Sequence, residues 1–323
     1  RSKARLWSNL GSRAVFGMAL FDLAERGVDF YAMSGDLVRS SGLARFQEKF
    51  PERCINMGIA EQNMLGVAGG MAKDGTPIFA TSFAPFITMR AAEQVRMNMG
   101  YMQLNVKTVG LGSGLIMAQL GNSHFGLEDV AVMRAIPNIT IVSPADCGEI
   151  VKAVAAIAQY KGSVYLRLTG GPGNPIVYQE EYDFVIGRAI TLRKGDDVAL
   201  VAAGTMVHTA LEAAELLAES GVSVQVVDMH TIKPLDTDCL DGLLSHRLLV
   251  TVEEHTVCGG LGGAVAESLA PKRVRPPHLL IGIEDVFPHA GSYDYMLNAC
   301  GLTADQIAMR IRATLDETAQ TAR

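Results

Sequence analysis

The stretch Ile59-Ala60-Glu61-Gln62-Asn63-Met64 is followed, after Leu65, by a run rich in small residues, Gly66-Val67-Ala68-Gly69-Gly70-Met71-Ala72. This run predicts a close-packed helix over residues 64–74, with Glu61 just before it. A carboxylate in that position interacts favourably with the positive end of the helix dipole, and most such charges are solvated. The residues around Glu61 therefore decide whether it has a functional role beyond this interaction with the helix dipole.

Short apolar stretches alternate with helical patterns through the first half of the chain. The predicted helices are residues 13–25, 64–74, 89–99 and 147–160, and the predicted strands are 29–34, 77–80, 106–111, 139–143 and 163–168. Short apolar strands separated by helices imply a parallel sheet that is covered by helices on both faces. A segment rich in Gly and Pro, residues 170–175, ends this unit.

A second unit of the same kind follows. Its predicted strands are 198–203, 222–228 and 248–253, and its predicted helix, 206–220, is followed by Gly221, which suits a left-handed C-cap. A chain of 323 residues is long enough for about two domains. We therefore predict an α/β fold with two domains, each a mainly parallel sheet flanked by helices. The predicted domains are residues 1–178 and 195–323, joined by a linker over 179–194.

Composition excludes several classes of protein. Hydrophobic residues make up 49% of the chain and charged residues 19%, which fits a packed protein rather than a disordered one. The net charge is −6 without any long Lys/Arg block, so nothing indicates nucleic acid. The longest apolar stretch, 198–207, is far shorter than the ~20 residues that span a bilayer. No signal-peptide pattern opens the chain.

Cysteines and histidines give no metal or disulfide pattern. The five cysteines form no CxxC pair, and their odd number argues against a disulfide framework, so we expect reduced thiols and a cytoplasmic protein. The seven histidines show no metal-ligand spacing, so no metal-binding residue is predicted in this chain.

The segment around Glu61 resembles the thiamine-diphosphate (ThDP) motif of the transketolase family, in which a glutamate meets the aminopyrimidine ring of the cofactor. Seven further segments follow the family's order, and they are Ser34–Leu37, Ala80–Phe86, Leu127–Asp129, Arg134–Asn138, Ser143–Asp146, Thr231–Asp236, and Val252–His255 with Gly259–Gly262. The resemblance extends from about residue 12 to residue 315. It implies a ThDP pyrimidine-binding domain followed by a transketolase C-terminal domain.

The resemblance assigns cofactor contacts to Glu61, Phe83 and Phe86. In the family, the glutamate protonates or hydrogen-bonds the far nitrogen of the pyrimidine ring, which enables the cofactor's own amino group to deprotonate the thiazolium. A partly buried carboxylate with a raised pKa suits this task. Aromatic side chains in the loop wall the pyrimidine ring, and we expect Phe83 to stack on it with Phe86 as its neighbour.

The resemblance also assigns substrate contacts. Arg13, Ser40 and Arg167 fall where transketolases bind the phosphate of a sugar phosphate, and guanidinium and hydroxyl groups suit an anion. His124 falls where many transketolases have a histidine that faces the substrate, so we expect a substrate contact or a proton relay. His255 belongs to the second domain, which is mostly structural in the family, and it receives no role.

Two positions depart from the family pattern. Where typical transketolases have a His and then an Asp for the hydroxyls of the sugar, this chain has Gly112 and Leu120. A buried hydroxyl left without a partner costs about 1–3 kcal/mol. We therefore predict that the substrates are not an ordinary pentose or hexose phosphate pair, or that another residue supplies the contact.

The sequence lacks the GDG motif with which the family holds the diphosphate and Mg²⁺. The chain therefore resembles the C-terminal half of a transketolase on a separate polypeptide. The resemblance implies that an N-terminal subunit supplies the diphosphate-binding domain and Mg²⁺, that the site lies between the subunits, and that the assembly is α₂β₂.

These features predict the small subunit of a split transketolase that transfers a two-carbon ketol unit from an anionic ketose, such as a sugar phosphate, to an aldose. One alternative is the β subunit of a 2-oxoacid dehydrogenase or a relative of deoxyxylulose-phosphate synthase. The other is a non-catalytic partner that scaffolds or regulates.

Overall fold

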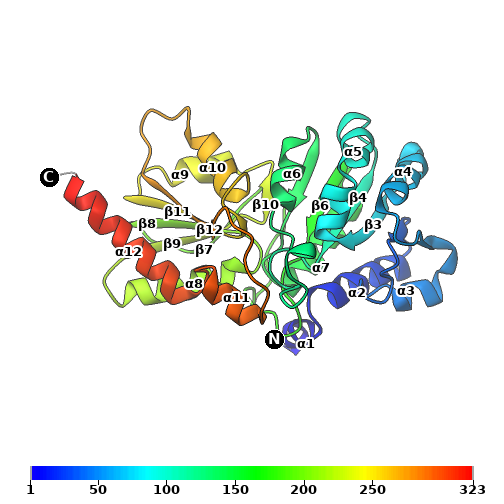
Figure 1. The fold of residues 1–323 in the computed structure, drawn as a ribbon, viewed down its shortest axis with the longest axis horizontal. Helices are drawn as coiled ribbons and strands as arrows, with labels where there is room; N and C mark the ends of the chain where they lie inside the picture. The colour runs from blue at the N-terminus through cyan, green and yellow to red at the C-terminus, as the bar shows by residue number, and fades with distance from the viewer. Residues whose placement is uncertain (1, 322–323) are drawn as a thin grey trace.

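A computed structural model describes residues 2–321 as two α/β units side by side (Figure 1). The first unit contains strands β1 (Tyr31–Ser34), β2 (Cys54–Asn56), β3 (Ile78–Phe83), β4 (Val106–Leu111), β5 (Ile139–Val142) and β6 (Ser163–Arg167). Its α-helices are α1 (Ser2–Leu10), α2 (Ser12–Glu25), α3 (Ala44–Lys49), α4 (Glu61–Met71), α5 (Ala92–Gln94), α6 (Asp129–Ala135) and α7 (Cys147–Gln159). The 3-10 and π-helical turns are η1 (Pro51–Arg53), η2 (Ala72–Asp74), η3 (Phe86–Arg90), η4 (Val95–Tyr101) and η5 (Gly121–Ser123).

The second unit follows after a long irregular segment. Its strands are β7 (Ile190–Arg193), β8 (Val198–Ala202), β9 (Val224–Asp228), β11 (Leu248–Thr256) and β12 (His278–Ile283). Its helices are α8 (Met206–Ala218), α9 (Thr237–Gly242), α10 (Leu261–Leu269), α11 (Tyr293–Ala299) and α12 (Ala304–Thr321). The short strand β10 (Thr231–Lys233) leaves this unit and joins the first sheet.

Both sheets are mainly parallel, which confirms the predicted fold class. The first has the strand order β10-β5-β6-β4-β3-β1-β2, and only the outermost strand, β10, is antiparallel to its neighbour. The second has the order β12-β11-β8-β9-β7, with β7 antiparallel at its edge. β7 lies inside the stretch 179–194 that the sequence predicts to be a linker. As an edge strand with partly exposed residues, β7 lacks the continuous apolar pattern of the central strands.

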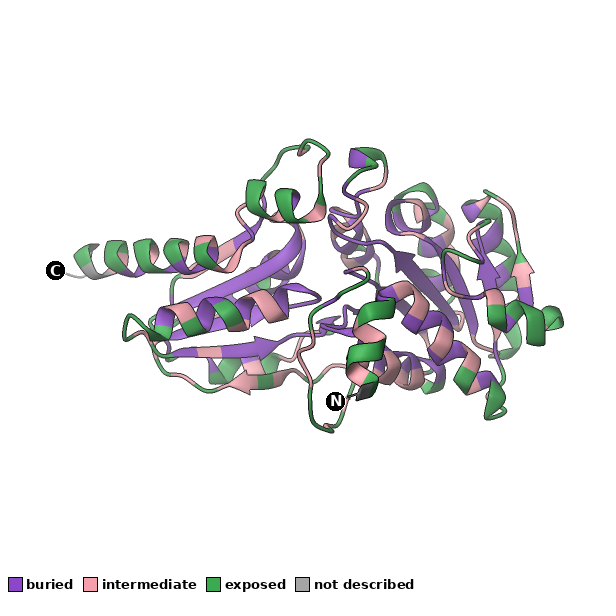
Figure 2. Ribbon diagram, turned by 90° about the horizontal axis from the view of Figure 1, so that it is seen from below, coloured by how far each residue is buried: buried purple, intermediate pink, exposed green. Residues whose placement is uncertain are grey.

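Helices cover both faces of each sheet. Side chains of α2 and α7 pack on one face of the first sheet, and those of α4 and α6 pack on the other. In the second sheet, α8 and α12 lie on one face and α10 on the other. The central strands of both sheets are largely buried, and exposed residues gather on the outer sides of the helices (Figure 2).

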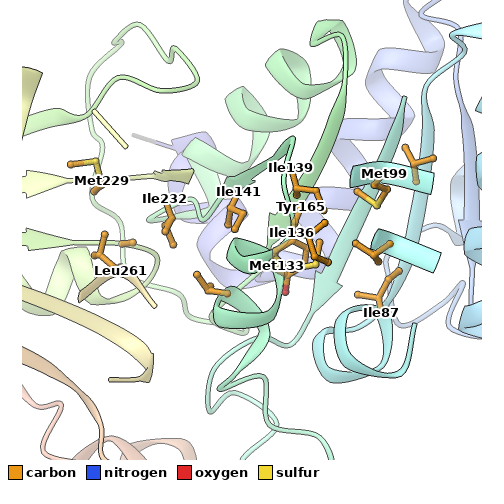
Figure 3. Close-up of a cluster of buried hydrophobic side chains, with 14 of the residues drawn as sticks. Ile87, Met99, Met133, Ile136, Ile139, Ile141, Tyr165, Met229, Ile232 and Leu261 are labelled. Atoms are coloured by element: carbon orange, nitrogen blue, oxygen red, sulfur yellow. The ribbon is translucent and has the colours of Figure 1, made fainter. Parts of the chain in front are cut away.

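One apolar cluster joins the two units. Ile141 and Tyr165 of the first sheet belong to the same buried cluster as Ile232 and Leu261 of the second half of the chain (Figure 3). The two units therefore share a core instead of being connected only by the chain.

Several predicted helix boundaries agree closely with the structure. Gly221 follows α8 with a φ of +78°, and it has the left-handed conformation expected of a C-cap.

The segment predicted as a helix over 89–99 is instead a short α-helix, α5, between two π-helical turns, η3 and η4. π-helical turns are often found at functional sites. Within residues 2–321, no helix is both long and apolar enough to cross a membrane.

Candidate active site

Glu61 is the first residue of α4 and is only 2% exposed. Its Oε1 accepts a hydrogen bond from Ser82 Oγ at 2.9 Å, near the end of β3. Its Oε2 accepts one from Arg90 Nη1, also at 2.9 Å, at the end of η3. Three elements therefore meet at this carboxylate, and Arg90 remains 45% exposed on the outer side of the pair.

The charge state of Glu61 differs from the expectation. Burial alone would raise its pKa, but hydrogen bonds from its own backbone at the helix start, from Arg90 and from Ser82 outweigh burial and hold the pKa below its usual value. The sequence suggested a raised pKa for Glu61, and this prediction was wrong, because the environment lowers the pKa instead. Glu61 is a buried, ionised acceptor in this structure.

Three rings gather beside this carboxylate. Phe83 and Phe86 meet edge to face with centroids 6.0 Å apart, and His124 meets them edge-on at 5.6 Å and 5.3 Å. The Arg90 guanidinium lies 4.0 Å from the centroid of Phe86, so it connects the rings to Glu61. The structure thus brings together four of the predicted site residues, from α4, β3, η3 and the loop after η5.

Arg13 and Ser40 also come together, at a separate place. Both line a cavity of about 240 Å³, together with Arg39 and the loop residue Gly171. A Cβ added to Gly17 of α2 would overlap the carbonyl oxygen of Gly42, so the bare glycine allows α2 to lie directly against the loop that carries Ser40. This close approach places two guanidinium groups and a hydroxyl around one small space.

Arg167 is not among the residues that line this cavity. It is 3% exposed, and its Nε donates to Asp129 Oδ2 at 2.8 Å. Its Nη2 donates to the carbonyl oxygens of Gly126 and Glu254 at 3.0 Å and 2.9 Å. These bonds hold the loop before α6 against β11. A direct contact between Arg167 and a substrate remains a prediction.

The two departures from the family pattern, Gly112 and Leu120, lie between β4 and η5. Gly112 has a φ of +62°, and a Cβ there would lie 2.8 Å from Cγ of Met117 and 2.9 Å from its Sδ. Leu120 is 51% exposed. The space over position 112 is therefore already filled by a thioether side chain.

Sequence reasoning missed Arg90, Arg39, Ser82 and Met117. Arg90 follows Phe86 by four residues, a helical spacing that places the two side chains on one face, so the sequence did hold a signal for it. Met117 gave none, because only the folded loop places it over Gly112.

Among residues 2–321, no group of three or more His, Cys, Asp or Glu side chains is arranged to hold a metal ion.

The chain matches two protein families in succession. Residues 8–171 match the transketolase pyrimidine-binding domain, and residues 187–307 match the transketolase C-terminal domain. It is 41% identical to a putative transketolase C-terminal section of Methanocaldococcus jannaschii over 93% of this chain and 95% of that protein. It is 38% identical to a 6-deoxy-6-sulfo-D-fructose transketolase subunit of a Clostridium species over 89% of each protein.

A solved structure is similar as well. A split-gene transketolase, described as an inactive β4 tetramer, superposes with a TM-score of 0.86 and 37% identity, over 95% of this chain and 99% of that one.

The fold and the buried glutamate among aromatic rings define a pyrimidine-binding domain of the kind that holds ThDP. The chain belongs to the transketolase family. Within that family it comprises the pyrimidine-binding and C-terminal domains, as do C-terminal sections and separate subunits of split transketolases, and it is a transketolase-family transferase.

Proposed function

We propose that this chain is the C-terminal subunit of a two-component transketolase that transfers a two-carbon ketol unit from an anionic ketose to an aldose. The observation that carries the proposal is Glu61, a buried carboxylate whose oxygens are fixed by Ser82 and Arg90 beside the rings of Phe83 and Phe86. This donor set fits the pyrimidine half of ThDP, which needs an acceptor for a ring nitrogen and flat apolar surfaces.

Bound ThDP would supply a nucleophilic carbon able to break and form carbon–carbon bonds next to a carbonyl group. The chain's own residues would orient and activate it. Glu61 would accept a hydrogen bond from the pyrimidine ring, and Phe83 would hold the ring face while excluding water. His124, which meets both rings edge-on, would donate to or accept from the substrate oxygen.

The anionic end of the substrate would bind in the cavity of Arg13 and Ser40, about 240 Å³ in volume. Arg39 adds a second guanidinium there, which suits a doubly charged phosphate or a sulfonate. The related transketolase subunit from Clostridium is named for a sulfonated sugar, which supports an anionic substrate without deciding between the two end groups.

We further propose that a second subunit holds the diphosphate and Mg²⁺ and completes the site in an α₂β₂ assembly. Support comes from the missing GDG motif and from relatives described as a C-terminal section, as a subunit and as the product of a split gene.

The test is Glu61→Gln in the complex reconstituted with the diphosphate-binding subunit. We expect a 10²- to 10⁴-fold loss of ketol transfer, because Gln keeps the shape but not the basic carboxylate. Glu219→Gln, at an exposed position after α8, serves as the matched control. Native mass spectrometry with ThDP and Mg²⁺ reports cofactor binding separately. Unchanged turnover of the Glu61 variant would remove the central assignment.

A further inference from the structure

His124 lies in the segment of residues 112–128, which connects β4 to α6 and which we call the His124 loop. The imidazole ring meets Phe83 and Phe86 edge-on, with centroids 5.6 Å and 5.3 Å apart. Its Nδ1 lies 2.9 Å from Oγ of Ser123, a neighbour that moves with the same loop. The position of the imidazole relative to the two phenylalanine rings therefore depends on how the loop as a whole is held.

The backbone of the His124 loop is not rigid by composition. Gly112, Gly114 and Gly121 have φ values of +62°, +74° and +72°, and glycine is the residue whose backbone is least restricted. Gly114 and Gly126 exchange backbone hydrogen bonds of 2.9 Å and 3.1 Å, which close the loop on itself. Closure alone does not fix the loop in the molecule, so its contacts with other elements decide where it lies.

A carboxyl group of the second unit holds the beginning of the loop. Glu254, on β11, is 1% exposed, and its Oε1 accepts a hydrogen bond from Leu115 N at 2.6 Å. Its Oε2 accepts hydrogen bonds from Thr205 Oγ1 and Tyr293 Oη at 2.7 Å each, which orient the carboxyl group. A Cβ added to Gly114 would overlap Oε1, so the bare glycine allows this close approach.

The end of the loop is attached to the same strand. Arg167 Nη2 donates to the carbonyl oxygens of Gly126 and Glu254, at 3.0 Å and 2.9 Å. Thr256 N donates to the carbonyl oxygen of Leu127 at 2.9 Å. Glu254 is therefore linked to the beginning of the loop through its side chain and, by way of Arg167, to the end of the loop through its main chain.

We propose that Glu254 is a positioning residue, which holds the His124 loop so that the imidazole keeps its place beside Phe83 and Phe86. The inference rests on the proposed ketol transfer, in which His124 meets the substrate oxygen. A catalytic group displaced by about 1 Å can cost about 100-fold in rate. The second unit, to which the sequence assigned a mostly structural part, thereby contributes to turnover through one side chain.

The experiment is a double-mutant cycle on kcat in the reconstituted complex, with His124→Ala, Glu254→Ala and the double variant. We expect Glu254→Ala to lower kcat by about 10- to 100-fold. The double variant should be no slower than His124→Ala alone, because a loop without its imidazole has no catalytic group left to position. The affinity for ThDP, measured by native mass spectrometry, should not change, because Glu61, Phe83 and Phe86 lie outside the loop.

Glu253→Ala is the matched control. Glu253 is a buried carboxyl group on the same strand, and it also accepts backbone hydrogen bonds, from Leu261 N at 2.6 Å and Gly262 N at 2.8 Å. These bonds hold the start of α10 and not the His124 loop. Its removal should lower stability in a similar way, and its effect on kcat should multiply with that of His124→Ala instead of vanishing.

The conservative variant Glu254→Gln should restore most of the turnover. Its amide oxygen can still accept from Leu115 N, and the hydroxyl groups of Thr205 and Tyr293 can rotate to accept from its amide nitrogen. If Glu254→Ala does not fold, Tyr293→Phe takes its place in the cycle, because it removes one of the two hydroxyl groups that orient the carboxyl group.

Hydrogen exchange measured by mass spectrometry tests the anchoring without an activity assay. Peptides from residues 112–128 should exchange faster in Glu254→Ala than in Glu253→Ala. Unchanged exchange there would overturn the inference, and so would a cycle in which the losses from Glu254→Ala and His124→Ala multiply independently. Absence of ketol transfer by the unmodified complex is a different result, because it removes the proposed function itself and this inference with it.

Discussion

At the scale of single residues, the carboxylate of Glu61 is paired with a side chain of this same chain, Arg90. Arg90 bonds to its Oε2 and also covers the ring of Phe86. Hydrogen bonds from the backbone at the start of α4, from this guanidinium and from Ser82 together hold the pKa of the carboxyl group below its usual value, while burial alone would raise it. An ionised carboxylate is the stronger hydrogen-bond acceptor, so the pair prepares Glu61 to receive a ring nitrogen.

Arg90→Gln should raise the pKa of Glu61, because it removes a charged donor from Oε2 while burial continues to favour the neutral form. The acid limb of the pH profile of kcat/KM should then move to higher pH. The measurement is that profile in the reconstituted complex. Arg96→Gln, which removes an exposed arginine paired with Glu93, should leave the limb in place. A limb that does not move would separate Arg90 from the ionisation of Glu61.

The sequence predicted the neighbourhood of the cofactor residues better than their physical state. Glu61, Phe83, Phe86 and His124 lie close together, as their order in the motifs suggested. The direction of the Glu61 pKa shift was wrong, because hydrogen bonds from its own backbone, from Arg90 and from Ser82 outweigh burial. Ser82 and Arg90 lie 21 and 29 residues from Glu61 in sequence, so only the fold shows that both bond to its carboxylate.

At the scale of secondary-structure elements, the cavity of Arg13 and Ser40 depends on how closely α2 approaches the loop before α3. Gly17 and Gly42 are in direct backbone contact there, with no room for a side chain at position 17. The spacing of apolar residues predicted α2 well, yet it did not indicate that a glycine in its middle sets a contact between elements.

Gly17→Ala should destabilise the protein by about 1–3 kcal/mol, because the added methyl group forces α2 away from the loop. Gly66→Ala is the matched control, since no atom lies within 4 Å of an added Cβ in that exposed turn of α4. It should raise stability by about 0.5–1 kcal/mol through helix propensity. Urea unfolding of both variants measures the difference. Equal free energies of unfolding for the two variants would mean that the close approach of α2 to the loop does not contribute to stability.

Elements at sheet edges were the hardest to predict. Central strands such as β4 and β8 are buried along their whole length, and their continuous apolar runs identify them. β7 and β10 are short and antiparallel at the edges, so their sequences carry a mixed pattern. The π-helical turns around α5 also escaped prediction, because their apolar spacing resembles that of an ordinary helix.

At the scale of the whole molecule, two buried carboxyl groups from different halves of the chain face each other. Glu149 lies on α7, and Asp228 lies at the end of β9. Tyr178 donates to Asp228 Oδ2 at 2.7 Å, and Tyr182 donates to Glu149 Oε1 at 3.3 Å. Burial raises the pKa of Asp228 to about 7 and raises the pKa of Glu149 well above its usual value. The pair therefore keeps protons that an unfolded chain would release.

This pair should make stability depend on pH. Because the folded pKa values lie above the unfolded ones, the favourable contribution is complete below about pH 4 and is lost as the pH rises toward about 7. Compared with Asp228→Asn, the unmodified chain should lose up to roughly 1.4 kcal/mol of unfolding free energy per pH unit in that range. Urea unfolding at pH 5, 6 and 7 measures the difference. Asp196→Asn, at an exposed position, should follow the unmodified chain, and parallel curves for Asp228→Asn would contradict the prediction.

The crossing of β10 into the first sheet has a consequence for how the protein is made. β10 is encoded within the C-terminal family domain, yet it covers the outer edge of β5 in the N-terminal sheet. Until the ribosome has added residue 233, β5 presents a row of unpaired backbone groups, which is a template for strand addition by another chain. The first domain of a nascent chain therefore cannot finish its sheet alone, and its completion waits for part of the second.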